Sequence, residues 1–367
     1  MQILCRNRHT MKAFYKNFPP LLIFAVLTVF SCCPKDKYIS FSGYAQGGTY
    51  TVKLNMNGEN GMVRIAPQTI KDSVDAILNR IDNSLSGYNS NSIISRFNNG
   101  ENVIPDKIFI DIYEKSYKLY EETSGIVDVA SAPLFDIWGF GFKSGEFPTD
   151  KKVLEVLDGC GMKRLTKDIA SRISEAHTLN GNDILENPGS GLPKLNYNAI
   201  AQGYSCDIVA EYLYSIGIKD MMVDIGEIFC DGLNPNGKSW SLGIDRPSDG
   251  NNTPGADLQG IFRAPQGPHG IVTSGNYRKY YIKDGKKYAH TIDPRTGKPV
   301  SHNLLSATIV APDATLADAY ATYCMVVGLE ESKKLLAENE QLEGCLIYDD
   351  NGTYATWCSD GFTLEQL

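Results

Sequence analysis

Two side chains that can supply oxygen ligands lie four residues apart toward the C-terminal end of the sequence. Asp318 and Thr322 fall in a segment of helical period, 316–328, so both oxygens project from one face of the predicted helix. A carboxylate and a hydroxyl that converge in this way suit a hard cation such as Mg²⁺, whose other ligands are water and phosphate oxygens. The alternative is a capping box, in which Thr315 and Asp318 bond to backbone amides at the start of the helix.

A histidine lies in a predicted β-hairpin upstream of that helix. Asp284-Gly285 separates two aromatic-rich β runs, and this dipeptide is typical of a two-residue hairpin turn. Alternation along the second strand places Tyr288, His290 and Ile292 on one face. There the imidazole can line the pocket of a planar ligand, or it can be a half-buried histidine whose hydrogen bonds are satisfied.

The segment 198–204, with the sequence Asn-Ala-Ile-Ala-Gln-Gly-Tyr, leads into a predicted helix. Amides at the start of a helix can bind a phosphate, and a glycine there permits close approach. The sequence contains neither a Walker-type loop nor a dinucleotide-binding fingerprint, so this segment alone is a weak signal.

The elements that position these residues follow from hydrophobic spacing and turn signals. We predict helices over 69–85, 107–122, 151–157, 202–217 and 316–328. We predict strands over 38–54 (broken at Gly47-Gly48), 221–225, 240–244, 271–274, 279–283, 287–292 and 305–311, with a terminal β region at the end. Loops are expected over 138–142 and 247–259, and a turn over 293–297. Helices and strands mix without strict alternation, which favours an α+β fold with one catalytic unit over a doubly wound sheet.

The composition limits the class of protein. The chain has 367 residues, 42% of them hydrophobic, and a net charge of -8, which is typical of a globular protein large enough to bury a ligand cleft. The acidic balance argues against nucleic acid as a partner, because a phosphate backbone requires a basic face.

The first residues have the pattern of an export signal. Four basic residues and no acidic residue precede the apolar run 21–30, which is too short to span a bilayer core of about 30 Å. The run ends in Val-Phe-Ser-Cys at 29–32, which resembles a bacterial lipobox. We therefore expect a lipoprotein signal peptide over 1–31 and a lipidated tether over 32–40 that begins at Cys32; the alternative is a plain signal peptide with a free Cys32 thiol.

The cysteines carry less information. They are Cys5, Cys32, Cys33, Cys160, Cys206, Cys230, Cys324, Cys345 and Cys358. None forms a C-x-x-C pair or lies at ligand spacing from a histidine, which disfavours a structural zinc site. Export permits disulfides, but the spacing does not identify a pair, and scattered buried thiols account for most of them.

Eight segments together resemble one family. They are 48–50, 90–98, 123–128 with 138–141, 198–204, 240–244, 273–278, 290–297 and 317–322. In this order they resemble the FAD:protein FMN transferase (ApbE) family, including its lipoprotein flavin-trafficking members, over most of the region 41–367. The resemblance implies a flavin cleft and a Mg²⁺-dependent transfer of FMN from FAD to a Thr or Ser hydroxyl of an acceptor protein, with release of AMP.

The resemblance also implies roles for individual residues. The metal ligands would be the Ala199 carbonyl, the Asp318 carboxylate and the Thr322 hydroxyl. The flavin contacts would be Tyr88, Ile126, Val127, Asp128, Asn196, Gln202 and Ile292. As a hypothesis, His290 is the general base, since an imidazole with a pKa of about 6.5 can take the hydroxyl proton.

The sequence differs from the family at two of these positions and at one further position. Amides stand at Asn196, Gln202 and Asn276, where the family commonly has charged residues, so the affinity for the cofactor is in question. Two alternatives follow: hydrolysis of FAD to FMN and AMP at the same metal, and storage of FAD by a lipoprotein without turnover.

The family also implies where the protein works. Its members modify subunits of membrane-bound redox complexes. We therefore expect an exported protein that is lipid-anchored to a bacterial membrane, faces the periplasm and meets such a subunit there.

Overall fold

The computed structural model describes residues 37–140, 147–165, 193–251, 253–277, 280–283 and 286–367, without the side chains of 281–289. The predicted signal peptide and Cys32 lie outside the described residues. Strand β1 begins at Tyr38, so residues 38–40 of the predicted tether belong to a strand. Within the described part of the chain, no helix is long and apolar enough to cross a bilayer.

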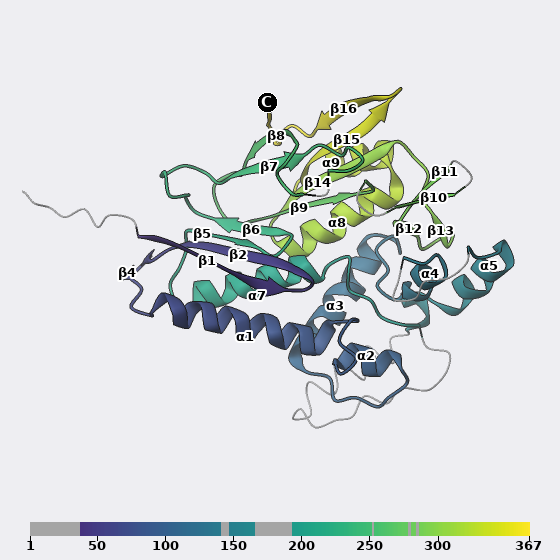
Figure 1. The fold of residues 1–367 in the computed structure, drawn as a ribbon, viewed down its shortest axis with the longest axis horizontal. Coiled ribbons are helices and arrows are strands. Elements are labelled where there is room, and N and C mark those ends of the chain that lie inside the picture. Colours follow the sequence, from purple (N-terminus) through teal and green to yellow (C-terminus); the bar gives the residue numbers. More distant parts are fainter. Residues whose placement is uncertain (1–36, 141–146, 166–192, 252, 278–279, 284–285) are drawn as a thin grey trace, which may run out of the picture. The chain divides into compact units, whose positions relative to one another are not determined.

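An eight-stranded antiparallel sheet forms the centre of the unit that begins at Asp36 (Figure 1). Its order is β1 (Tyr38–Ala45), β2 (Gly48–Asn55), β5 (Met221–Asp224), β6 (Ile228–Asp231), β9 (His269–Gly275), β14 (Leu304–Ala311), β15 (Glu343–Asp350) and β16 (Thr353–Cys358). A second sheet has the order β17 (Leu364–Gln366), β8 (Leu258–Arg263) and β7 (Ser241–Asp245). Short pairs complete the strands: β3 (Asn57–Gly58) with β4 (Gly61–Met62), β10 (Tyr280–Lys283) with β11 (Lys286–Ala289), and β12 (Ile292–Asp293) with β13 (Lys298–Pro299).

The two faces of the large sheet bury different partners. Successive side chains of a strand point to opposite faces. Ile309 and Leu346 therefore join a core cluster with a helix, whereas Val310, Cys345 and Ile347 join a cluster with the three-stranded sheet. Helices cover one face and the small sheet covers the other, as expected for an α+β fold, which the structure confirms.

The helices are α1 (Pro67–Leu85), α2 (Ile93–Asn98), α3 (Lys107–Glu122), α4 (Ala132–Ile137), α5 (Asp150–Gly159), α7 (Ala201–Ser215), α8 (Ala314–Val327) and α9 (Leu329–Glu338). The five predicted helices are present with small shifts at their ends. In α1, residues Ile70, Val74, Ile77 and Ile81 are buried, which is the apolar stripe that the spacing predicted. α2, α4 and α9 were not predicted.

The β-region differs from the prediction in three places. β6 lies between the predicted strands, and β8 begins at Leu258 inside the predicted loop 247–259. The predicted strand 287–292 is broken, because β11 ends at Ala289 and Ile292 begins the separate pair β12–β13. The hairpin itself is confirmed, since Lys283 pairs with Lys286 across the two residues between them.

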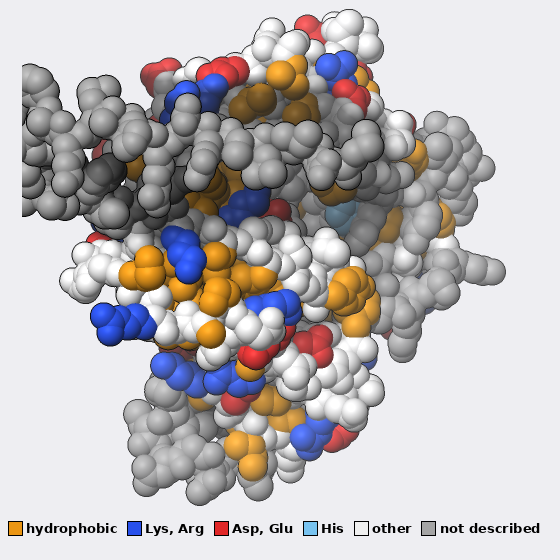
Figure 2. Space-filling view, turned by 60° about the vertical axis from the view of Figure 1, so that its left-hand side comes forward, with side chains coloured by type: hydrophobic (Ala, Val, Ile, Leu, Met, Phe, Trp, Pro, Cys, Tyr) orange, Lys and Arg blue, Asp and Glu red, His pale blue; other side chains and the backbone are white. Residues whose placement is uncertain are grey.

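Charged side chains of both signs share the face shown in Figure 2, where hydrophobic side chains lie among them. The chain also forms exposed ion pairs, such as Arg263–Glu365 at 2.6 Å and Arg96–Glu101 at 2.9 Å. Exposed pairs contribute only about 0–1 kcal/mol each. The fold therefore depends mainly on the buried clusters.

Candidate active site

Helices α7 and α8 meet at a glycine. A Cβ atom at Gly203 would lie 2.2 Å from the Ala314 carbonyl oxygen and 2.9 Å from the Asp318 Cβ. Only a residue without a side chain permits this separation. The glycine that the sequence suggested for a phosphate therefore serves close packing of two helices.

Asp318 satisfies an amide of the neighbouring helix. Its carboxylate accepts a hydrogen bond from the Gly203 amide at 3.1 Å. α7 begins after Ile200, whose side chain offers no cap, so a carboxylate from α8 takes that role. The helix dipole favours a negative charge at this end.

The capping is reciprocal, because α7 also supplies a carboxylate to α8. Asp207 accepts hydrogen bonds from the Ala314 and Thr315 amides at 2.8 Å each, and from the Thr315 hydroxyl. The N-cap of α8 is Asp313, which accepts from the Leu316 amide at 2.7 Å. The predicted capping box is therefore wrong, since Thr315 donates to Asp207 and Asp318 bonds to α7.

The Asp318 carboxylate is buried, and Asp207 is partly buried. Burial raises the pKa of Asp318 well above its ordinary value. The hydrogen bond from the Gly203 amide lowers this pKa, and the charge on Asp207 raises it. Burial raises the pKa of Asp207 to about 6, although the hydrogen bonds from Thr315 lower it. Among the described residues, neither carboxylate forms an ion pair with lysine or arginine. A cation at this junction would offset the cost of burying these charges.

The predicted oxygen ligands for such a cation belong to α8 and to the segment just before α7. Along the helix contact, Asp207 meets Ala314 and Thr315, and Gly203 meets Ala314 and Asp318. Ala199 lies two residues before α7 begins, and Thr322 lies one turn after Asp318 in α8; both residues are half-buried. Within the described ranges, no group of three or more His, Cys, Asp or Glu can hold a metal. A metal here would thus depend on one carboxylate, a hydroxyl, a carbonyl and water, which suits Mg²⁺.

A pocket of about 230 Å³ lies at Asp128, one of the predicted flavin contacts. Its wall includes Tyr120, Cys160 and the turn residue Arg295. The Asp128 carboxylate accepts from the Ala130 amide at 2.9 Å and the Met162 amide at 3.0 Å. Burial raises the pKa of Asp128, and these two amides lower it. The carboxylate thus holds the wall of the pocket together.

The other predicted flavin contacts differ in exposure. The side chains of Ile126, Val127 and Ile292 are buried, so only their backbone atoms can meet a ligand where they stand. Ile292 packs in a small core cluster with Leu134 and Cys160. Tyr88, between α1 and α2, is 78% exposed, so most of its side chain faces solvent.

Three amide side chains stand where the family commonly has charged residues, and each forms a hydrogen bond with the backbone. Gln202 donates to the Ile225 carbonyl at 3.0 Å, and the Asn196 side chain accepts from the Asn198 amide at 2.9 Å. Asn276 donates to the Leu304 carbonyl at 3.0 Å. In the described part of the chain, therefore, these amides fix loops around the start of α7 and the end of β9.

His290 lies between β11 and β12, outside a strand. Its ring and the Phe140 ring are edge to face, with centroids 6.5 Å apart. Phe140 belongs to the predicted aromatic loop 138–142, whose last two residues lie outside the described ranges. The half-buried histidine thus lies beside an aromatic side chain from a distant segment.

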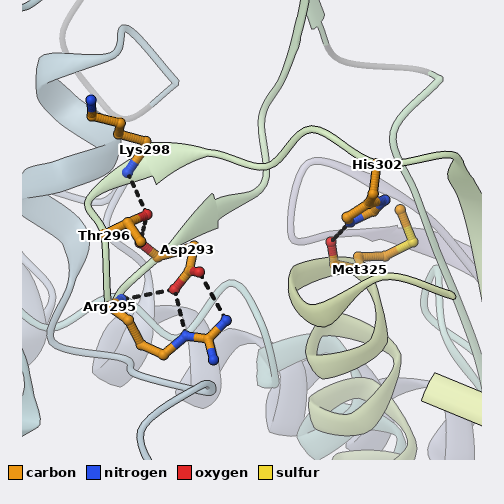
Figure 3. A network of polar contacts seen from close by, with 6 residues as sticks. All are labelled: Asp293, Arg295, Thr296, Lys298, His302 and Met325. Carbon is orange, nitrogen blue, oxygen red and sulfur yellow. Dashed lines mark hydrogen bonds and ion pairs between the residues drawn. The ribbon is translucent and has the colours of Figure 1, made fainter. Parts of the chain in front are cut away.

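The predicted turn after His290 is present, and hydrogen bonds join its residues (Figure 3). The Arg295 guanidinium donates to both Asp293 oxygens, at 3.0 and 2.9 Å, and its amide donates at 2.8 Å. Thr296 accepts from the Lys298 amide at 3.3 Å. β12, which leads into the turn, contacts α8. The turn therefore links the pocket at Asp128 to the helix that carries Asp318.

Sequence reasoning missed Asp207 and Arg295, and it misread the role of Gly203. Asp207 stands between Cys206 and Ile208 in a largely apolar helix, and an acid within such a run is a signal of a buried polar contact. No signal in the sequence pairs it with α8, because that contact spans more than a hundred residues of chain.

Comparison with known proteins identifies the family. Residues 47–346 match the ApbE family. The FAD:protein FMN transferase of Haemophilus influenzae is 30% identical over 345 residues, which cover 92% of this chain and 94% of that protein. The Escherichia coli protein of the same name is 32% identical over 303 residues, which cover 80% of each chain.

Solved structures that resemble this chain belong to the same family. The flavin transferase ApbE from Vibrio cholerae superposes with a TM-score of 0.71 at 29% identity, and covers 89% of this chain and 98% of its own. The apo flavinyl transferase ApbE from Pseudomonas stutzeri also gives 0.71, at 27% identity, and covers 89% and 95%. The resemblance in the sequence is thus confirmed, and the chain belongs to the ApbE family, whose curated members are transferases.

Proposed function

We propose that this protein transfers FMN from FAD to a Thr or Ser hydroxyl of an acceptor protein, releases AMP and requires Mg²⁺. The hydroxyl oxygen forms a bond to the phosphorus of the FMN moiety, the diphosphate bond breaks, and AMP leaves with the bridging oxygen. The family and its named relatives support the FMN transfer. The observation that carries the metal requirement is the buried Asp318 carboxylate beside the partly buried Asp207 at the α7–α8 junction.

The residues that would hold the metal are Asp318, Thr322 and the Ala199 carbonyl. Bound there, Mg²⁺ would supply positive charge that offsets the negative charge of phosphate oxygens. The packing of Gly203 against α8 fixes the distance between the two helices, so the ligands from both are held in place before substrate arrives. The bond from the Gly203 amide fixes one Asp318 oxygen in the same way.

In this proposal His290 takes the proton of the acceptor hydroxyl. The ring is half-buried beside Phe140 and lies two residues before Ile292, where the chain enters the hydrogen-bonded turn of Asp293 and Arg295. A neutral imidazole has the proton affinity for this step near pH 7.

The experiment compares two aspartates of α8. The protein is incubated with FAD, Mg²⁺ and an acceptor domain, and the acceptor is then separated under denaturing conditions and read by flavin fluorescence while AMP is quantified. Asp318→Asn keeps the shape of the side chain and an acceptor for the Gly203 amide, but loses the charge. We expect transfer to fall roughly 100-fold or more, whereas Asp313→Asn, a matched change at the N-cap, keeps the wild-type rate because asparagine caps a helix equally well.

The two alternatives are outcomes of the same experiment. AMP without a fluorescent acceptor indicates FAD hydrolysis, and bound FAD without AMP at any Mg²⁺ concentration indicates a storage protein. Equal rates for Asp318→Asn and wild type would contradict the metal site.

The location is part of the proposal. Lipidation at Cys32 after removal of 1–31 would hold the protein on a bacterial membrane facing the periplasm, where its acceptor would be a subunit of a membrane redox complex. Metabolic labelling with a radioactive fatty acid is expected to mark the wild type and not Cys32→Ala, and equal labelling of both contradicts it.

A further inference from the structure

Two cysteines face each other at the edge of the large sheet. Cys345 of β15 and Cys358 of the edge strand β16 are direct partners in the antiparallel register. Among the described cysteines, no other two occupy opposite positions in a strand pair. The sequence did not identify this pair because thirteen positions separate the two residues.

The register is fixed by the turn that joins the strands. Asn351 and Gly352, at φ 54° and 89°, form a two-residue turn between Asp350 and Thr353. Asn-Gly with two positive φ angles is the preferred hairpin turn, and it sets which residues pair. The strands then pair without a bulge from Thr353 to Cys358.

The pair occupies the kind of position at which side chains lie closest. One residue further from the turn, the Ser359 amide donates to the Gly344 carbonyl at 2.9 Å, so Gly344 and Ser359 face each other at a hydrogen-bonded position. Positions alternate along an antiparallel pair. Cys345 and Cys358 therefore form a non-hydrogen-bonded pair, with Cα atoms about 4.5 Å apart, within the range that a disulfide bridges.

Both side chains point to the same face. Cys345 is fully buried in the cluster under the three-stranded sheet, and Cys358 packs against that cluster. The proximity of the two thiols lowers the pKa of Cys358 and raises that of Cys345. Cys358 is half-buried, so a reagent can reach the thiol that ionises more readily.

We propose that Cys345 and Cys358 form a cross-strand disulfide when the protein meets a disulfide-bonded oxidant. The Cys358 thiolate attacks one sulfur of the oxidant and releases the other as a thiol, which leaves a mixed disulfide. Cys345 then loses its proton and attacks the Cys358 sulfur, and the second half of the oxidant leaves as a thiol. Two protein thiols and one small disulfide thus give one protein disulfide and two small thiols.

The bridge would hold the edge strand. β16 pairs with β15 alone in the large sheet, and the chain after it leads into β17 of the small sheet. A covalent link at the last residue of β16 would tie the C-terminal segment to the core at the end opposite the turn. We expect higher thermal stability in the oxidised form, because the bridge restricts the unfolded chain.

Peptide mapping tests the bond directly. The full chain is equilibrated with excess oxidised glutathione, alkylated and digested with trypsin and with a protease that cleaves before aspartate. Cleavage after Lys334 and before Asp349 isolates Cys345 in 335–348, and cleavage before Asp350 and Asp360 isolates Cys358 in 350–359. We expect these two peptides to be joined, and separated by reduction. Recovery of both as alkylated or glutathione-bound single peptides overturns the proposal.

Thermal melting of oxidised and reduced protein is a second measurement. We expect the melting temperature of wild type to rise by roughly 5 °C on oxidation. Cys358→Ser should abolish the rise, whereas Cys160→Ser, a matched change at a cysteine outside the sheet, should keep it. A rise that persists in Cys358→Ser means that another pair is responsible and contradicts the assignment. If Cys358→Ser fails to fold, the peptide map of wild type decides alone.

Discussion

At Gly203, the methyl group of an alanine would force helices α7 and α8 apart. A Cβ atom there meets backbone of α8 at 2.2 Å, and backbone cannot rotate away as a flexible side chain does. We expect Gly203→Ala to lower the free energy of unfolding by about 1–3 kcal/mol. The control is Gly159→Ala in α5, where no atom lies within 4 Å of the new Cβ. Equal stability of the two variants, measured by urea unfolding, would show that the helices tolerate the methyl group.

His290 is the residue whose proposed role is purely chemical. His290→Gln keeps a polar side chain of similar size but cannot take a proton. We expect transfer to slow by roughly 100-fold at pH 7, and the acidic limb of the pH–rate profile to disappear. Transfer at the wild-type rate at neutral pH would mean that another group takes the proton.

His302 gives a pH dependence of stability. It bonds through Nε2 to the Met325 carbonyl at 3.0 Å, beside the end of α8 (Figure 3), and burial lowers its pKa. The folded protein therefore keeps this ring neutral at a pH where the unfolded chain, with a histidine pKa of about 6.5, binds a proton. The contribution is complete above about pH 6.5 and is lost as the pH falls below it.

The measurement compares wild type with His302→Asn between pH 7.5 and pH 5. Asparagine can donate to the same carbonyl but does not titrate. We expect the unfolding free energy of wild type to fall more steeply with acid than that of the variant, while other titrating groups cancel in the difference. Parallel pH curves would contradict burial of a neutral His302.

At the scale of elements, α8 depends on a carboxylate from α7. Asp207 satisfies two amides and a hydroxyl in the first turn of α8, and removal leaves these donors buried. We expect Asp207→Ala to lower the unfolding free energy by about 2–3 kcal/mol. Asp207→Asn, which keeps one acceptor, should lose less. Asp313→Ala, at the exposed N-cap, should lose about 1 kcal/mol. Circular dichroism during urea unfolding checks the order of the three, and an Asp207→Ala loss no larger than that of Asp313→Ala contradicts it.

The sequence predicted helices and strands correctly where a hydrophobic pattern within the segment itself determines the structure. α1 and α3 carry an apolar stripe over four turns or more and begin and end near the predicted residues. β6 was missed because it follows β5 after only three residues, and β8 because a glycine interrupts it. α9 was missed because it follows α8 after Gly328 alone. Short elements beside strong signals are held by tertiary packing, which a local pattern does not contain.

The sequence predicted the candidate site only in part, for a related reason. Spacing placed Asp318 and Thr322 on one helix face, but their relation to α7 depends on contacts between segments far apart in the chain. The capping box stood as an alternative because its local partner was visible in the sequence and Asp207 was not. The amides at Asn196 and Gln202 were expected at the flavin, and the structure shows their bonds to backbone.

At the scale of the whole described unit, one sheet carries two layers. Its helical face positions α7 and α8, on which the proposed chemistry depends, and its other face holds the small sheet and the proposed disulfide. Alternating side chains of β14 and β15 serve both layers. The oxidation of Cys345 and Cys358 is therefore expected to change stability through the face that does not carry Asp318, so failure of one proposal leaves the other testable.

Removal of the metal tests the whole assembly of ligands. Chelation by EDTA is expected to abolish FMN transfer, and Mg²⁺ added in excess is expected to restore it to wild type but only weakly to Asp318→Asn. Transfer that continues unchanged in EDTA would exclude a dissociable cation from the reaction.

The most direct measurement of the central claim is mass spectrometry of an acceptor domain after incubation with this protein, FAD and Mg²⁺. The acceptor should gain the mass of one FMN less one water, mapped to a Thr or Ser, with one AMP released per modification. An acceptor of unchanged mass while FAD is consumed, or no consumption of FAD at all, would contradict FMN transfer as the function of this protein.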